Sequence, residues 1–151
     1  MGIDKDIQQN RFLNDYQRAS VNILFTYGWL MEKIKDILKA ADITPQQFNI
    51  LRILRGSHPQ PLSTLQIRER MLDKMSDTSR IVDRMVAKGL VNKAMSRHDR
   101  RLVDILISSK GLKLLRKLDS RQHELDGILK NISAKEAATL SKILDKVRKG
   151  G

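Results

Sequence analysis

Arginine side chains gather in two short stretches of this sequence, and arginine matches the oxygen atoms of phosphates and base edges well. The first stretch, residues 76–84, reads SDTSRIVDR, with Arg80 and Arg84 about one helical turn apart. On the exposed face of a helix, such guanidinium groups can pair with phosphates or bind guanine in a DNA major groove. A solvated face of charged residues is the ordinary alternative, and this stretch alone does not decide between them.

The second stretch, residues 97–101, reads RHDRR. An arginine held at the end of a rigid loop suits a narrow minor groove, whose negative potential attracts it. Asp99 stands two residues before Arg101, so its carboxylate can fix the direction of that guanidinium. Charged turns often serve only solubility, but a basic turn beside a basic helix favours a contact with DNA.

The short polar residues that begin the first stretch are also candidates. The first turn of a helix has free N–H groups and a positive dipole end, which suit a phosphate. Asp77 and Asp83 are unfavourable beside a polyanion, so we expect each to orient a neighbouring arginine or to accept a hydrogen bond from cytosine. The predicted DNA-binding residues are Ser76, Asp77, Thr78, Ser79, Arg80, Arg84, Arg97, Asp99, Arg100 and Arg101.

The overall composition agrees with a polyanionic partner. The 151 residues include 29 Lys and Arg against 17 Asp and Glu, for a formal charge of +12. The absence of cysteine excludes disulfides, thiolate metal sites and cysteine redox sensing. No stretch approaches the ~20 apolar residues of a membrane helix, and no signal peptide is evident, so we expect a cytoplasmic protein.

A helix and a hairpin must position these candidates. Ser76 is predicted to cap a helix over residues 77–88, which ends at Gly89. Residues 90–95 and 102–107 are aliphatic and β-branched runs on either side of the basic turn, which is typical of a two-stranded hairpin. A helix and a basic hairpin that emerge side by side are the layout of a winged helix-turn-helix.

Two shorter helices are predicted before this stretch. Thr44 is expected to cap a helix that begins at Pro45 and closes at Gly56. Ser63 is expected to cap a second helix that runs to Met71, after a loop that contains two prolines. Together with the basic helix they complete a helix-turn-helix.

The two ends of the chain are predicted to form long helices. Apolar residues recur at steps of three and four over residues 4–41, as in one long amphipathic helix. Another helix begins at Ser108 or Ser109, and Ser133 with Glu136 forms a capping box before the last one. A helix longer than about 25 residues exceeds what a small domain needs, so we expect it to pack on another subunit.

The sequence therefore predicts a mainly α-helical chain with a small β-hairpin wing. Residues 44–107 form the winged helix-turn-helix, and residues 1–43 and 108–151 form a helical dimerisation region, within a single structural domain. One such unit reads too few base pairs to be selective. A homodimer would hold two recognition helices ~34 Å apart on one face of double-stranded DNA.

The run IVDRMVAKGLVNKAMSRHDRRLVDILISSKG, residues 81–111, resembles the signature of the MarR family of winged-helix transcription regulators. The TPQQFNIL helix start at residues 44–51 extends the resemblance. It implies an obligate homodimer joined by the first and last helices, pseudo-palindromic operators and release by a small ligand. By position, Asp99 and Arg101 match the D-x-R pair of the wing, and residues 76–80 with Arg84 match the recognition helix.

The sequence departs from that family pattern at two places. Arg68 stands where the family usually carries a small alanine against the core, and the wing strand ends in Ile-Ser where Leu-Thr is common. The first change can alter helix packing locally. Neither removes a residue expected to contact DNA.

Aromatic residues gather in the N-terminal third of the chain. In proteins that resemble this one, effectors bind between the dimer helices and the winged-helix lobe, so a small aromatic or amphipathic ligand is implied. Aromatics at helical spacing are more often core or dimer interface. The candidate pocket residues are Tyr16, Tyr27, Trp29 and Phe48.

Other classes of function find little support. The three histidines are far apart in the sequence, and no catalytic acid–base pair, nucleophile motif or glycine-rich phosphate loop is present, so we expect neither an enzyme nor a metal or cofactor. The prediction is a homodimeric, sequence-specific DNA-binding transcription regulator, a repressor that has no membrane contact. The alternatives are a winged-helix protein-interaction module and a nonspecific architectural DNA binder.

Overall fold

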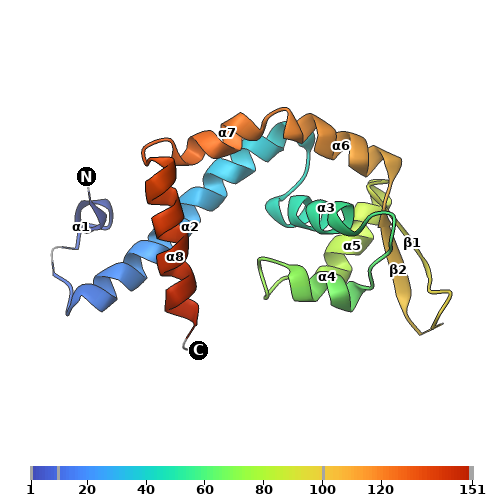
Figure 1. Ribbon diagram of the computed structural model, residues 1–151, viewed down its shortest axis with the longest axis horizontal. Coiled ribbons are helices and arrows are strands. Elements are labelled where there is room, and N and C mark those ends of the chain that lie inside the picture. The colour runs from blue at the N-terminus through green and yellow to red at the C-terminus, as the bar shows by residue number, and fades with distance from the viewer. Residues whose placement is uncertain (1, 10, 100, 150–151) are drawn as a thin grey trace.

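The computed structural model describes residues 2–9, 11–99 and 101–149. Helices dominate, and one antiparallel hairpin projects from them, as the sequence predicts (Figure 1). The elements in chain order are α1 (Ile3–Asp6), α2 (Asp15–Leu38), the 3-10 turn η1 (Lys39–Ala41), α3 (Pro45–Ser57), α4 (Thr64–Arg70), α5 (Thr78–Ala87), β1 (Val91–Met95), β2 (Val103–Ile107), α6 (Ser109–Asp119), α7 (Gln122–Asp126), the 3-10 turn η2 (Gly127–Leu129) and α8 (Ala134–Arg148).

The first helix differs from the prediction of one element over residues 4–41. α1 and α2 are separate, because Asn14 starts a new helix by accepting a hydrogen bond from the Gln17 N–H at 2.9 Å. Gln8 in the connection has a φ of 54°, in the left-handed region that helices avoid. The apolar periodicity continues across this break and therefore conceals it.

Three other helix starts are confirmed where the sequence places them. Thr44, Ser63 and Ser133 each accept a hydrogen bond at 3.1 Å from the N–H of the residue three positions later. The Gln or Glu at that later position reaches back to the capping residue in each case, so all three are complete capping boxes. These caps determine where α3, α4 and α8 begin.

The hairpin also agrees with its prediction to within one residue at each strand. β1 pairs with β2 in a register that runs from Val91 opposite Ile107 to Met95 opposite Val103. A bridge absent from the prediction joins Leu62, just before α4, to Ile105 on β2, with N···O distances of 3.1 and 2.9 Å in the two directions. The hairpin is thereby fixed to the helices as well as to itself.

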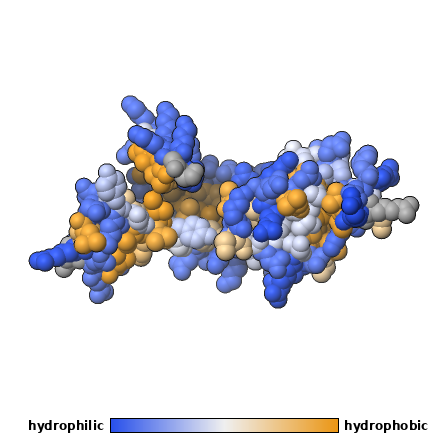
Figure 2. Space-filling view, turned by 90° about the horizontal axis from the view of Figure 1, so that it is seen from below, coloured by the Kyte–Doolittle hydropathy of each residue, from blue (hydrophilic) through white to orange (hydrophobic). Residues whose placement is uncertain are grey.

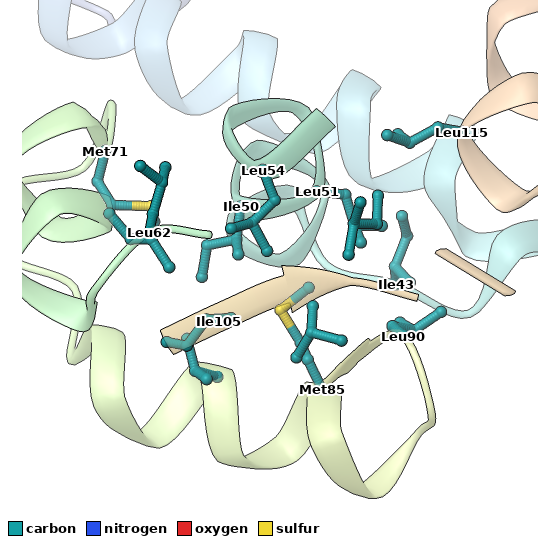
Figure 3. Packing of buried hydrophobic residues seen from close by; sticks show 14 of the residues in the cluster. Ile43, Ile50, Leu51, Leu54, Leu62, Met71, Met85, Leu90, Ile105 and Leu115 are labelled. Carbon is teal, nitrogen blue, oxygen red and sulfur yellow. The ribbon is translucent and has the colours of Figure 1, made fainter. Parts of the chain in front are cut away.

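The core lies in one lobe, which consists of α3 to β2 (residues 45–107) and is closed by α6. In Figure 3, β2 crosses between α3 and α5, and Leu51, Leu54 and Met85 point into the space between these elements. Ile43 and Leu115 extend the cluster into the flanking segments. Ile105 and Ile107 on one face of β2 are buried in this cluster, which holds the hairpin against the helices.

The terminal helices α2 and α8 lie outside this core (Figure 1). α8 has no buried residue, and α2 buries only Leu38 at its end. Figure 2 shows apolar side chains gathered over the end of the molecule that holds these two helices. Their exposed large apolar residues are Tyr16, Ile23, Leu24, Phe25, Tyr27, Trp29, Leu140, Ile143 and Val147.

Candidate DNA-binding surface

The basic helix is α5, the second helix of the helix-turn-helix, and its cap differs from the prediction. Asp77 is the N-cap, and its Oδ1 accepts a hydrogen bond from the Arg80 N–H at 3.2 Å. Ser76, the predicted cap, instead lies in the preceding turn, where its N–H donates to the Asp73 carbonyl oxygen. Aspartate caps a helix as well as serine does, so residue type did not distinguish two adjacent candidates.

The exposed face of α5 carries the predicted candidates. Ser79, Arg80 and Arg84 are exposed, whereas Val82 and Met85 on the opposite face are buried in the lobe. Two arginines one turn apart on a fixed helix can reach phosphates or guanine edges. The helical spacing also predicts that Val86 is buried with the other apolar residues of α5, but its side chain is exposed.

Neither Asp77, the cap of α5, nor Asp83 within it pairs with an arginine side chain of the described residues, so one of their two predicted roles is wrong, and a hydrogen bond with cytosine stays a prediction. Asp77 is occupied as the cap, and Asp83 forms an ion pair with Lys93 on β1, with Oδ1 2.9 Å from Nζ. The pair connects the middle of α5 to the hairpin. Both carboxylates have a structural partner, so the exposed guanidinium groups are not engaged by them.

The hairpin tip is organised by Ser96, which the sequence analysis did not identify. This buried hydroxyl oxygen accepts hydrogen bonds from the N–H groups of His98 at 3.2 Å and Asp99 at 3.4 Å. The Ser96 N–H donates to the Leu102 carbonyl oxygen, and the Leu102 N–H donates to that of Asp99. These bonds connect His98 and Asp99 to the residues that follow β1 and precede β2.

Asp99 holds Arg101 as the spacing predicts. Its Oδ1 accepts from the Arg101 N–H at 3.0 Å and Nε at 3.1 Å, and its Oδ2 accepts from Nη2 at 3.2 Å. Two hydrogen bonds lower the pKa of the Asp99 carboxyl: the one from the Arg101 side chain has the larger effect, and the one from the Arg101 backbone N–H has the smaller. The Arg101 side chain is 89% exposed, so a fixed guanidinium projects into solvent. Arg97 is also exposed, and Arg100 lies outside the described residues.

A hydrogen-bonded junction joins the end of α5 to the start of α6. Gly89 ends α5 with a φ of 74°, and its carbonyl oxygen accepts from the Ser108 hydroxyl at 2.6 Å. The Ser108 Oγ accepts in turn from the Gly111 N–H at 3.0 Å, which caps α6. Lys110 Nζ donates to the Lys88 carbonyl oxygen at 2.7 Å, also at the end of α5. Hydrogen bonds therefore connect the end of the basic helix α5 to the start of α6.

The four aromatic candidates for an effector pocket are not brought together within one subunit. Tyr16 and Trp29 both lie on α2, 13 positions apart, which is about 20 Å along a helix. Tyr16 and Tyr27 are exposed, whereas Phe48 on α3 packs against the core with the Arg52 guanidinium 5.6 Å from its ring centre. Two cavities of the described residues, one beside α3 and one beside α4, are lined by none of the four.

Those two cavities lie elsewhere in the fold. One, of about 420 Å³, is lined by residues between α2 and α3 together with Lys88. The other, of about 390 Å³, lies between α4 and the N-terminus of α5. Within residues 2–9, 11–99 and 101–149, no three His, Asp or Glu side chains come together as metal ligands, and no helix has the length and apolar character to cross a bilayer.

Comparisons with known proteins identify relatives of this architecture. A sequence model of the MarR family matches residues 41–102. The Multiple antibiotic resistance protein MarR of Escherichia coli (strain K12) is 27% identical over 120 residues, which are 76% of this chain and 79% of that protein. A MarR transcription factor from Planctomyces limnophilus is 29% identical, with a TM-score of 0.67 over 89% of this chain and 98% of that chain.

Two further solved structures share the fold at lower identity. A mutant MarR from E. coli complexed with operator DNA has a TM-score of 0.81 at 23% identity, over 92% of this chain and 99% of that chain. An organohalide-sensing transcriptional regulator in its 2,4-dichlorophenol-bound form has a TM-score of 0.81 at 23% identity. The match covers 91% of this chain and 82% of that chain.

Proposed function

Because the chain belongs to the MarR family of winged-helix transcription regulators, we propose that it is a homodimeric, sequence-specific regulator that represses from pseudo-palindromic operators. In this proposal the recognition helix α5 enters the major groove and the hairpin reaches the adjacent minor groove. The chain has no enzymatic role and acts in the cytoplasm, where its DNA is.

The observation that carries the proposal is the Asp99–Arg101 pair at the hairpin tip. A solubilising charge needs no fixed direction, whereas Arg101 is held by three hydrogen bonds to one carboxylate and is still almost fully exposed. A preoriented guanidinium loses less entropy when it enters a narrow groove. Arg80 and Arg84 on the exposed face of α5 supply the neighbouring contacts with bases and phosphates.

The exposed apolar faces of α2 and α8 support the dimer. A run of large apolar side chains that stays exposed in one chain marks a surface that another protein covers. We assign residues 1–43 and 108–151 to a dimerisation region and residues 44–107 to the DNA-binding region. The dimer places two α5 helices about 34 Å apart, one turn of the duplex.

We further propose that a small aromatic or amphipathic effector releases the DNA. The four aromatic residues lie apart within one subunit, so the proposed site combines Tyr16 or Tyr27 of one protomer with Trp29 and Phe48 of the other. The dichlorophenol-bound relative gives a probe of this class. Trp29 is the only tryptophan, so quenching of its fluorescence by 2,4-dichlorophenol, with loss of DNA binding, tests the site directly.

The decisive experiment for DNA binding compares Arg101→Ala with Arg116→Ala. Both variants lose one exposed positive charge, but Arg116 lies on α6, away from the hairpin. We expect Arg101→Ala to weaken binding to DNA selected from the source genome by roughly 1–3 kcal/mol per contact, whereas Arg116→Ala binds like the wild type. Fluorescence anisotropy at moderate salt measures both affinities, and sedimentation verifies that each variant is still a dimer.

The same titrations separate the alternative functions. Equal affinity for random duplexes and selected DNA would identify a nonspecific architectural binder. An absence of DNA binding at low salt would leave the protein-interaction module and would refute the proposal. Equal effects of the two substitutions would show that Arg101 contributes only its charge.

A further inference from the structure

Lys88 ends α5, at the opposite end of that helix from the turn proposed to face DNA. Its ammonium group donates a hydrogen bond to the carbonyl oxygen of Asp42, the residue that follows α2 and η1. A longer hydrogen bond of 3.4 Å reaches the buried Gln47, whose Oε1 also accepts from the Thr44 N–H in the capping box of α3. The side chain of Lys88 therefore connects the basic helix to the turn between α2 and α3, and we name this contact the Lys88 tether.

The backbone of Lys88 makes a second connection, to the C-terminal helices. Its carbonyl oxygen accepts a hydrogen bond from Nζ of Lys110 on α6 at 2.7 Å. Asp42 and Lys110 belong to the two segments, residues 1–43 and 108–151, that we assign to the dimerisation region. One residue at the end of the basic helix is thus hydrogen-bonded to both segments. No side chain within α5 itself hydrogen-bonds to the described residues before α3.

The acceptor in the Lys88 tether is a backbone atom at a sharp change of chain direction. Asp42 has a φ of 54°, in the left-handed region, and the chain turns there from η1 into α3. The last carbonyl oxygens of a helix lack intrahelical donors, and a lysine ammonium can supply one. The carboxylate of Asp42 contributes less, because its Oδ2 lies 3.9 Å from Nζ and the side chain is 99% exposed.

Apolar packing holds the same turn close to the lobe but does not set its direction. Leu38 and Ile43, on either side of the turn, are buried in the core cluster. In Figure 3, Ile43 lies at the same end of the core as Leu90, two positions after Lys88. Hydrophobic contacts are non-directional, and a cavity of about 420 Å³ leaves part of this turn unpacked. A hydrogen bond has a preferred angle, so the Lys88 tether can fix an orientation that packing leaves variable.

We propose that the Lys88 tether sets the angle between each lobe and α2, and so determines which spacing of DNA half-sites the dimer accepts. This inference rests on the proposed DNA-binding function, in which two α5 helices bind half-sites about one helical turn apart. The distance between two such helices is defined only if each keeps a fixed relation to the dimerisation region. Lys88 is a positioning residue, because it acts through the orientation of α5.

The test measures affinity for duplexes that differ only in half-site spacing. Two copies of a half-site selected from the source genome are placed at centre-to-centre distances that change by single base pairs around a value of about 10 bp. We expect the wild type to prefer one spacing. Fluorescence anisotropy measures each affinity, together with that for an isolated half-site at low salt. Thermal unfolding verifies that each variant is folded.

Lys88→Met keeps the length and the apolar stem of the side chain and removes the ammonium group. We expect binding at the preferred spacing to weaken by roughly three- to thirtyfold, with a smaller loss at neighbouring spacings, so that the preference becomes broader. Affinity for the isolated half-site should stay the same, because the residues of α5 that face DNA are intact. Lys88→Arg retains a cationic donor and should restore most of the preference.

Two matched controls separate the tether from charge. Lys39 lines the same cavity and is exposed, and its ammonium group forms no ion pair with a described carboxylate. Lys39→Met removes the same charge and should leave the spacing preference unchanged. Asp42→Asn removes the carboxylate, keeps the carbonyl oxygen and tolerates the left-handed conformation, so it should also preserve the preference.

The pattern of loss decides the outcome. An equal loss by Lys88→Met at every spacing and on the isolated half-site would overturn the proposal, because it would show a general effect on the fold. A broader preference in Lys39→Met would attribute the effect to charge and would also overturn it. A broader preference in Asp42→Asn would overturn the assignment of the carbonyl oxygen as acceptor. A wild type that binds no duplex, or binds paired and isolated half-sites equally, would refute the proposed function itself.

Discussion

The lobe and the terminal helices belong to one chain, yet they bury their apolar residues in opposite ways. In the lobe, Leu51, Ile67 and Ile105 are completely inaccessible to solvent. α8 has an amphipathic sequence and a complete capping box but buries no residue. Local sequence specifies both regions equally well, and only the lobe finds its tertiary partners within the same chain.

This difference separates folding from assembly. Burial of a large aliphatic side chain contributes about 1.5–3 kcal/mol, so the lobe accounts for most of the free energy of folding of one protomer. In the proposed dimer, the apolar residues of α2 and α8 contribute fully only after a second subunit covers them. Substitutions in the lobe should therefore change protomer stability, whereas substitutions in α8 should change the concentration dependence of unfolding.

The largest expected effect is at Gly111, where α6 joins the lobe. A Cβ here would clash with the Leu90 carbonyl oxygen and would lie 2.8 Å from Cγ1 of Ile107. Overpacking a core costs about 1–3 kcal/mol, and the backbone oxygen cannot move aside, so we expect Gly111→Ala to lose at least ~3 kcal/mol of unfolding free energy. Urea denaturation measures the loss.

Gly28→Ala is the matched control in the terminal helices. A Cβ at Gly28 meets nothing within 4 Å, and alanine favours the helix interior by about 1 kcal/mol. The same urea experiment should show an unchanged or higher unfolding free energy. Comparable losses at both glycines would contradict the division between the lobe and the terminal helices.

The next largest difference is expected between the stability losses of Leu51→Ala in the core and Ile143→Ala on α8. Leu51 is completely buried, so its truncation should cost about 2–5 kcal/mol at every protein concentration. Ile143 is 54% exposed, so its truncation should affect the protomer little and weaken the dimer. Unfolding at several protein concentrations, with sedimentation of the native protein, distinguishes the two. Concentration-independent destabilisation by Ile143→Ala would be evidence against an interface on α8.

A smaller effect is expected from Asp83→Asn. The substitution breaks the 2.9 Å pair with Lys93, but both side chains are substantially exposed. An exposed ion pair contributes at most about 1 kcal/mol, so a small loss of stability is expected, and it should decrease as salt increases. Asparagine has nearly the same size as aspartate, so any change in stability reports the loss of the charge. A loss that high salt leaves unchanged would show that the pair acts through packing.

The smallest effect concerns protonation of Asp99. The hydrogen bonds from Arg101 lower the pKa of this carboxyl in the folded protein, so their contribution is present above the unfolded pKa of about 3.9 and is lost as pH falls through the folded value. A carboxyl NMR titration should give a pKa below the ordinary range in the wild type, and a value close to the ordinary range in Arg101→Gln. Equal values in the two proteins would show that the ion pair does not form in solution.

The features that sequence predicted correctly depend on neighbouring residues. Hydroxyl caps at Thr44, Ser63 and Ser133 and the glycine that ends α5 act over three or four positions, and the structure contains all of them. The Asp99–Arg101 pair has the same local character. The predicted starts of α3, α4 and α8 are accurate for this reason, whereas the start of α5 is one residue later than predicted because Asp77, and not Ser76, is its cap.

The features that sequence missed depend on residues far apart in the chain. The bridge between Leu62 and Ile105, the Asp83–Lys93 pair and the cavity between α4 and the start of α5 all require the tertiary fold. The break between α1 and α2 was missed for another reason, because the hydrophobic period continued through it. Sequence therefore identified the wing and the recognition helix, but not the contacts that join them.

The junction between α5 and α6 has a mechanical consequence. α5 is anchored at its C-terminal end, by the bonds of Ser108 to Gly89 and of Lys110 to Lys88, while its N-terminal turn is the end aimed at DNA. The ten residues of α5 span about 15 Å and pack on the lobe through the buried Thr78, Val82 and Met85, so a rotation of the whole lobe by about 10° about this junction moves the N-terminal end of α5 by about 2.6 Å. A displacement of that size is comparable to a hydrogen-bond length. A modest rotation of the lobe is thus amplified at the N-terminal end of α5, enough to separate a side chain from a base edge that we propose it contacts.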